Sequence, residues 1–182
     1  MKKLLLAALP LALLAWVAAP ATAKIERLSL EQMVEKTDNA LDAEIVAHQV
    51  FKVDHPRDGE LYFTKLTLAG RSLRDGRATT VDVVYAGGFI DEQNGVWNSE
   101  APSEDDVRIG NKVVAFYRFV PNLGGDVSAN ALYTSHGGIY RTQSGPAGRV
   151  VLGRGEGYAI PFNTQIENLT TSVRTFSEKF GK

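Results

Sequence analysis

Through the middle of the chain, apolar and polar positions alternate with the two-residue period of a β-strand. From residue 43 to residue 53, Ile45, Ala47 and Phe51 fall on one face and His48 falls on the other. This pattern predicts a strand with one buried face. Other segments share the alternation, or the β-branched and aromatic composition of strands: 61–68, 79–86, 112–120, 131–134, 139–142, 149–152 and 157–160.

Turn signals separate these segments. Pro56 and the pair Asp58-Gly59 predict a tight turn at 55–59, because proline fixes φ and Asp-Gly tolerates positive φ. Another Asp-Gly pair lies within 74–77. Short strands with a turn about every ten residues are typical of a sandwich or a small barrel rather than a parallel α/β sheet.

The pattern changes to a helical one before the first strand. Ser29 is a good N-cap, and Gln32 stands three residues later, as a capping box requires. Met33 and Val34 give the helix a short apolar stripe, and we expect it to end near Asp38. The first folded element is therefore predicted to be a short amphipathic helix.

A second amphipathic helix is predicted over 164–180. Thr164 and Glu167 have capping-box spacing. The apolar seam of this helix consists of Ile166, Leu169, Val173, Phe176 and Phe180, at intervals of three and four residues. We expect the seam to cover the end of a barrel, and a homodimer through the 164–180 helix is the alternative. The predicted fold is mainly β, a small antiparallel barrel or sandwich with an amphipathic helix at each end.

The first 23 residues have the pattern of a secretory signal. Lys2 and Lys3 precede an apolar run over 4–19, and small residues end the segment at Ala23. We expect cleavage between Ala23 and Lys24. The chain is then divided into a signal at 1–23 and a single domain at 24–182, exported to the periplasm or the medium, with no membrane span after signal removal.

Charge and cysteine content exclude several classes of function. The signal holds two of the 20 basic residues and no acid, so residues 24–182 carry 18 basic and 21 acidic groups and a formal charge of −3. This balance gives no support for a nucleic-acid partner. The chain contains no cysteine, which excludes disulfides, thiolate metal sites and a cysteine nucleophile.

A long loop between predicted strands, 87–110, is the best candidate for a contact surface. Residues 78–107 contain no lysine or arginine, and loops of this length are often functional. The alternative is a solvated loop that protects a sheet edge. The candidate contact residues are Asp91, Glu92, Asn94, Trp97, Glu104, Asp105 and Asp106.

Metal binding is a weaker interpretation of the same residues. Calcium needs six to eight converging oxygens, and 91–95 lacks the alternating acidic spacing of a calcium loop. The histidines, His48, His55 and His136, have no recognisable zinc spacing. We therefore predict no cofactor, with calcium or zinc as the alternatives.

No motif in the sequence assigns a catalytic residue. Ser135 and His136 are adjacent, and adjacent side chains on a strand point to opposite faces, which places them poorly as nucleophile and base. The glycine-rich run 153–157 lacks the last glycine and the following helix of a dinucleotide site. Pairs of carboxylates are plentiful, but the sequence selects none.

Several motifs resemble uncharacterised secreted bacterial domains that occur alone or beside matrixin-type metalloproteases. The similar segments are 28–38 with 45–50, 83–88 with 113–116, and 136–141. The resemblance implies an OB-like or netrin-like barrel. Ala47-His48 stands where these domains usually have glycine, and netrin-like protease inhibition needs an N-terminal cysteine that this chain lacks.

The sequence thus favours a non-catalytic exported β-barrel that binds an unknown protein or an envelope or extracellular ligand. The alternative is an exported hydrolase or metal-dependent enzyme that uses acids of the 87–110 loop.

Overall fold

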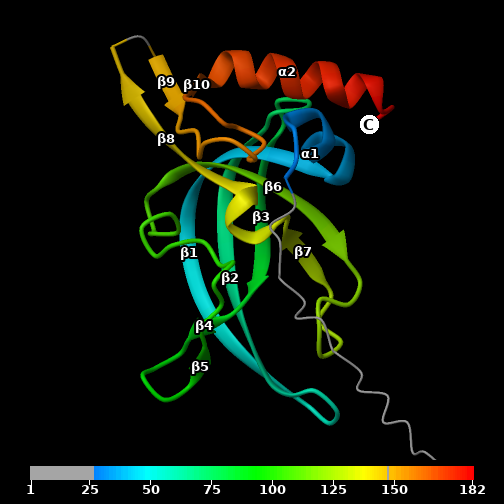
Figure 1. Cartoon of the computed structure of the whole chain (residues 1–182), viewed down its shortest axis with the longest axis vertical. Helices are drawn as coiled ribbons and strands as arrows, with labels where there is room; N and C mark the ends of the chain where they lie inside the picture. Colours follow the sequence, from blue (N-terminus) through cyan, green and yellow to red (C-terminus); the bar gives the residue numbers. More distant parts are fainter. Residues whose placement is uncertain (1–26, 147) are drawn as a thin grey trace, which may run out of the picture.

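The computed structural model describes residues 27–146 and 148–182, and it is mainly β with two α-helices (Figure 1). The predicted signal, with cleavage between Ala23 and Lys24, lies outside the described residues. Within them the polypeptide forms a barrel with helices at one end. The mainly β fold with a barrel and two helices, expected from the sequence pattern, is confirmed.

Five strands close the barrel. Its order is β1-β2-β3-β7-β6, and β6 pairs again with β1. All neighbours are antiparallel except β3 and β7, which are parallel. The five strands are β1 Asn39–His55, β2 Gly59–Ser72, β3 Ala78–Ala86, β6 Lys112–Val120 and β7 Ala129–Leu132.

Shorter elements are attached to this barrel. β8 pairs with β6 and continues into a hairpin with β9, while β4 and β5 form a separate hairpin after β3. Their bounds are β4 Gly88–Phe89, β5 Gly95–Val96, β8 Ile139–Gly145, β9 Gly148–Val151 and β10 Thr164–Gln165. The helices are α1 Leu30–Lys36, the 3₁₀ turn η1 Ser135–Gly138 and α2 Ile166–Lys179.

Strand β6 separates two hydrophobic cores because its side chains alternate between faces. Val113, Ala115 and Tyr117 lie in the barrel interior, whereas Val114 and Phe116 point to the helices. Phe116 and Tyr117 are adjacent, so they lie on opposite faces of β6. In the structure Phe116 packs in the core beneath the helices and Tyr117 packs in the barrel interior.

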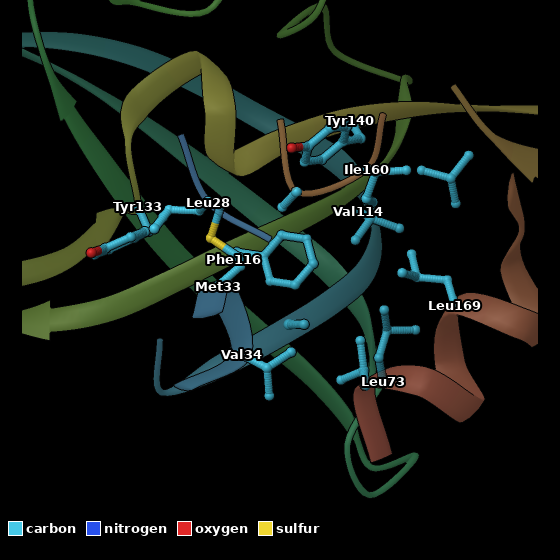
Figure 2. Packing of buried hydrophobic residues seen from close by; sticks show 14 of the residues in the cluster. Leu28, Met33, Val34, Leu73, Val114, Phe116, Tyr133, Tyr140, Ile160 and Leu169 are labelled. Atoms are coloured by element: carbon cyan, nitrogen blue, oxygen red, sulfur yellow. The ribbon is translucent and has the colours of Figure 1, made fainter. Parts of the chain in front are cut away.

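The helical core fills the space between α1, α2 and the outer face of the barrel (Figure 2). Phe116 packs edge-on against Tyr140, with ring centroids 6.2 Å apart. Figure 1 shows α2 lying across the end of the molecule beside α1. Leu169 and Val173 of its seam are buried in this core, so the seam packs within the chain. The homodimer through residues 164–180 stays a prediction.

The structure tests the N-cap residues predicted for the two helices. The Ser29–Gln32 capping box is present, with both reciprocal hydrogen bonds formed. The cap predicted at Thr164 is wrong, because residues 164–165 pair with β9 and the N-cap is Gln165 without a side-chain bond. The strand predicted at 157–160 is also wrong, since this segment is made of turns and bends.

Strand β1 contains a β-bulge that the alternation does not reveal. Ile45 pairs with Leu68 and Ala47 pairs with Thr67, so Val46 is the extra residue. After the bulge, His48 pairs with Leu66, a residue of the barrel interior. Ile45 and Ala47 therefore do not share a face as the alternation predicts, and His48 moves to the inner side at the open end of the barrel.

Candidate functional site

The open end of the barrel, opposite the helices, is flanked by two cavities. The first has a volume of about 420 Å³ and lies between the start of β2 and the β6–β7 loop, with Tyr62 and Leu123 in its lining. The second, about 400 Å³, is lined by His48, Thr64 and Glu104. Trp97 borders both cavities. We call this end, with its two cavities and the β4–β5 hairpin, the open-end surface.

The β4–β5 hairpin exposes a run of large apolar side chains. Phe89, Ile90, Val96 and Trp97 are 52, 51, 47 and 75% exposed. The hairpin begins at Gly88, where a Cβ would lie 2.4 Å from the Thr64 hydroxyl, so glycine is needed for this close approach. Gly88 pairs with Val96 and Phe89 with Gly95, so Phe89 and Val96 lie on opposite faces of the hairpin. Exposed apolar side chains gathered on one hairpin make it a candidate interaction site.

The turn of the hairpin uses three of the predicted contact residues. The Asp91 carboxylate accepts hydrogen bonds from the backbone N–H groups of Gln93 and Asn94, and from the Asn94 side chain. These bonds lower the pKa of Asp91 below its usual range, the Asn94 side chain contributing most. Asp91 and Asn94 therefore hold the turn, and Glu92 at its tip is exposed.

The three acids at 104–106 have three different environments. Glu104 lines the second cavity and is exposed. Asp105 pairs with Arg108 at the surface, at 2.6 Å. Asp106 is buried, and its Oδ2 accepts from Arg154 at 2.8 Å, while its Oδ1 lies 3.3 Å from Arg141.

Asp106 anchors the loop to the body of the protein. Burial alone would raise the pKa of Asp106, but hydrogen bonds from Arg154 and Ser103 and the positive charges of Arg154 and Arg141 outweigh it and hold that pKa below its usual range. Arg154 also donates to the carbonyl of Ile139. The prediction of Asp106 as a surface contact is therefore corrected, because a buried ion pair fixes it.

The three histidines contact different parts of the chain. His48 lines the second cavity. His55 lies at the end of β1, with Asp58 at 2.9 Å and Asp126 at 3.5 Å. His136 in η1 has one ring nitrogen 2.7 Å from the Glu100 carbonyl and the other 3.1 Å from the Tyr158 hydroxyl. A polar network therefore holds His136 beside the loop.

No set of three or more His, Cys, Asp or Glu side chains in the described part of the chain is arranged to hold a metal ion. None of the helices within residues 27–146 and 148–182 is long and apolar enough to cross a bilayer.

The carboxylate of Glu60 is the one charged group among the described residues that line the first cavity. Lys52 donates to Glu60 at 2.8 Å, and the Tyr62 hydroxyl donates to the same carboxylate at 3.0 Å. These bonds lower the pKa of Glu60, the lysine bond contributing most. Leu61, Phe63 and Leu123 make the cavity largely apolar elsewhere.

Sequence reasoning missed three members of the open-end surface, Phe89, Ile90 and Val96. The Asn94-Gly95 pair, a strong signal for a two-strand hairpin, lies between them. This pair predicts a hairpin in the first part of the 87–110 loop, and the structure has that hairpin at β4 and β5. Trp97 is predictable from the sequence, because it is a tryptophan in the middle of a long loop that contains no lysine or arginine until Arg108.

Comparison of this chain with protein-family models, curated proteins and solved structures gives no match.

Proposed function

We propose that residues 24–182 form a non-catalytic exported binding domain with an OB-like barrel, and that it contacts a protein partner through the open-end surface. The exposed apolar run on the β4–β5 hairpin carries the proposal. Apolar side chains that a chain leaves in water are best accounted for by a partner that covers them.

The side chains of the hairpin favour a protein partner over a saccharide. Ile90 and Val96 are aliphatic and offer few hydrogen bonds, whereas sugars need flat aromatic rings and many polar groups. Trp97 is of the residue type most enriched at the energetic centre of protein interfaces. The absence of lysine and arginine from residues 78–107 favours a neutral or basic surface on the partner.

The strand order supports the OB-like assignment. An OB-fold is a five-stranded Greek-key barrel. It binds ligands near its second and third strands, at the loop that joins its first two strands and at the loop that joins its last two. Here the first cavity lies against β2 and the β6–β7 loop, which joins the fourth and fifth barrel strands. The relationship to netrin-like domains beside metalloproteases is part of the same proposal.

The alternative is a hydrolase or metal-dependent enzyme that uses acids of the 87–110 loop. Asp91, Asp105 and Asp106 each have a structural partner, which leaves Glu92 and Glu104 as its candidate groups. Alanine at Glu92 and Glu104 together would abolish an activity of this kind, and metal analysis of the purified protein tests its metal-dependent form.

The binding proposal is tested with a hairpin variant and a matched control. Phe89→Ser with Trp97→Ser removes the two aromatic rings of the apolar run, whereas Phe162→Ser removes an aromatic ring that is 72% exposed but lies elsewhere. Each immobilised protein is incubated with the envelope fraction of the producing cell. A partner retained by wild type and by Phe162→Ser, but not by the hairpin variant, is the expected result.

Retention of the same proteins by all three would contradict the proposal, provided circular dichroism shows that each variant is folded. Export has its own test, since the proposed signal predicts a product that begins at Lys24. N-terminal sequencing of the protein from the producing cell would reveal an uncleaved chain if this is wrong.

A further inference from the structure

Strand β1 has an edge that no other strand in the described part of the chain covers. Residues 39–44 pair with β6 on this side, but from Ala47 to His55 the pairing is with β2 alone. His48 and Gln49 are exposed, and Val50 and Phe51 are partly exposed. An open edge of this length is a template for an added strand.

One hydrogen bond between β2 and the residue after β3 fixes which backbone groups face this edge. The Gly87 N–H donates to the carbonyl of Tyr62 at 2.7 Å, so the backbone of Tyr62 faces β3. Lys52 of β1 lies opposite Tyr62 of β2, so the two residues form a non-hydrogen-bonded pair. In a pair of this kind the backbone N–H and carbonyl groups of both residues point away from each other. By the two-residue period, the N–H and carbonyl groups that face the open edge belong to His48, Val50, Lys52 and Asp54.

The first half of the open edge carries no protecting charge, and the bulge at Val46 lies before the edge begins at Ala47. Residues 45–51 contain no charged side chain, proline or glycine. The nearby charges are already paired, because the Lys52 amine lies 3.1 Å from Asp54 and 2.8 Å from Glu60. A segment of this composition is suited to pairing with another strand.

We propose that this edge pairs with the same edge of a second copy of the chain, antiparallel, about a two-fold axis at Phe51. The four residues with outward backbone groups are placed symmetrically about Phe51, so this register pairs all of them. His48 then lies opposite Asp54 of the second copy, and Val50 lies opposite Lys52.

The side chains agree with this register. The imidazole of His48 can donate to the carboxylate of Asp54 across the pair, twice in the dimer by symmetry. On the other face, Phe51 lies opposite its own copy. Phe51 already stacks on Phe63 with ring centroids 5.6 Å apart, so the dimer extends an aromatic cluster across the axis.

The absence of cysteine from the chain permits a sharp test. In Phe51→Cys the two sulfurs face each other in a non-hydrogen-bonded pair with Cα atoms about 4.5 Å apart, within the range of a disulfide. In the control, Gln49→Cys, position 49 faces residue 53 of the second copy, so the two introduced thiols lie about 13 Å apart. Mild oxidation should give a covalent dimer from Phe51→Cys and none from Gln49→Cys.

A double variant keeps Phe51 in place. Gln49→Cys with Val53→Cys brings residue 49 of one copy opposite residue 53 of the other, so it should cross-link although Gln49→Cys alone does not. Sedimentation of the unmodified protein should give twice the mass of one chain. A monomer at 100 µM, equal cross-linking of Phe51→Cys and Gln49→Cys, or a dimer in which neither Phe51→Cys nor the double variant cross-links would overturn the proposal.

Discussion

Asp106→Asn should destabilise the fold by about 2–3 kcal/mol. The change keeps the shape of the side chain but leaves Arg154 without its negative partner. Breaking a fully buried ion pair costs about 3–5 kcal/mol, and a hydrogen bond to a charged group contributes about 1.5–3 kcal/mol. The side chains of Asp106 and Arg154 are 12 and 22% exposed, so water at the surface lowers the cost below that of a fully buried pair.

The measurement is urea and thermal unfolding at pH 7, where this loss corresponds to a Tm lowered by about 5–10 °C. Asp105→Asn is the matched control, because it changes the neighbouring residue in the same way. The side chains of Asp105 and Arg108 are 69 and 72% exposed, so the control should lose less than about 1 kcal/mol. Equal losses in the two variants would refute the reasoning.

The same variant has a defined pH dependence. The pKa of Asp106 is lower in the folded protein than in the unfolded chain, so its ionisation stabilises the fold above the unfolded value of about 3.9. That contribution is lost as the pH falls through the folded pKa. The difference in free energy of unfolding between wild type and Asp106→Asn should therefore be constant from pH 5 to 7 and shrink below about pH 4. A difference that grows on acidification would contradict the assignment.

Three further substitutions test the fold by chemical denaturation. Gly70→Ala should destabilise by more than about 3 kcal/mol or prevent folding, because the new Cβ would lie 2.1 Å from the carbonyl of Asp42 in β1. Phe116→Ala should cost about 3–5 kcal/mol because it empties the centre of the helical core. Ser29→Ala should cost only about 1 kcal/mol, since it removes one bond of the capping box with Gln32.

The parts of the fold that could be predicted depend on interactions close in sequence. The Ser29–Gln32 capping box spans one turn of helix, and the bounds of β6 are predictable because seven of its nine residues are apolar or aromatic. The bulge at Val46 has no such local signal, since neither glycine nor proline marks it. The bulge lies where β1 leaves β6, just after Glu44, and this boundary is set by pairing with a strand far along the chain.

The residues of the candidate site also divide into those that the sequence alone predicts and those that depend on distant partners. Trp97 and Glu104 could be assigned to a surface from their residue type and their place in a polar loop. Asp106 could not be told from Asp105, because its burial depends on Arg154 and Arg141, which are distant in sequence. The role of an acid in such a loop is set by the partners that the fold brings to it.

Closure of the barrel by β1 and β6 has a consequence for how the protein folds. The two strands that complete the ring are separated in the chain by β2, β3 and the hairpin, and Asp38 before β1 accepts a hydrogen bond from the N–H of Phe119. The chain loses entropy when such distant segments come together, before the contacts of the closed ring can stabilise it. Folding should therefore take milliseconds to seconds rather than microseconds. A chain that is synthesised from its N-terminus must therefore wait for β6 before β1, its earliest strand, has both neighbours.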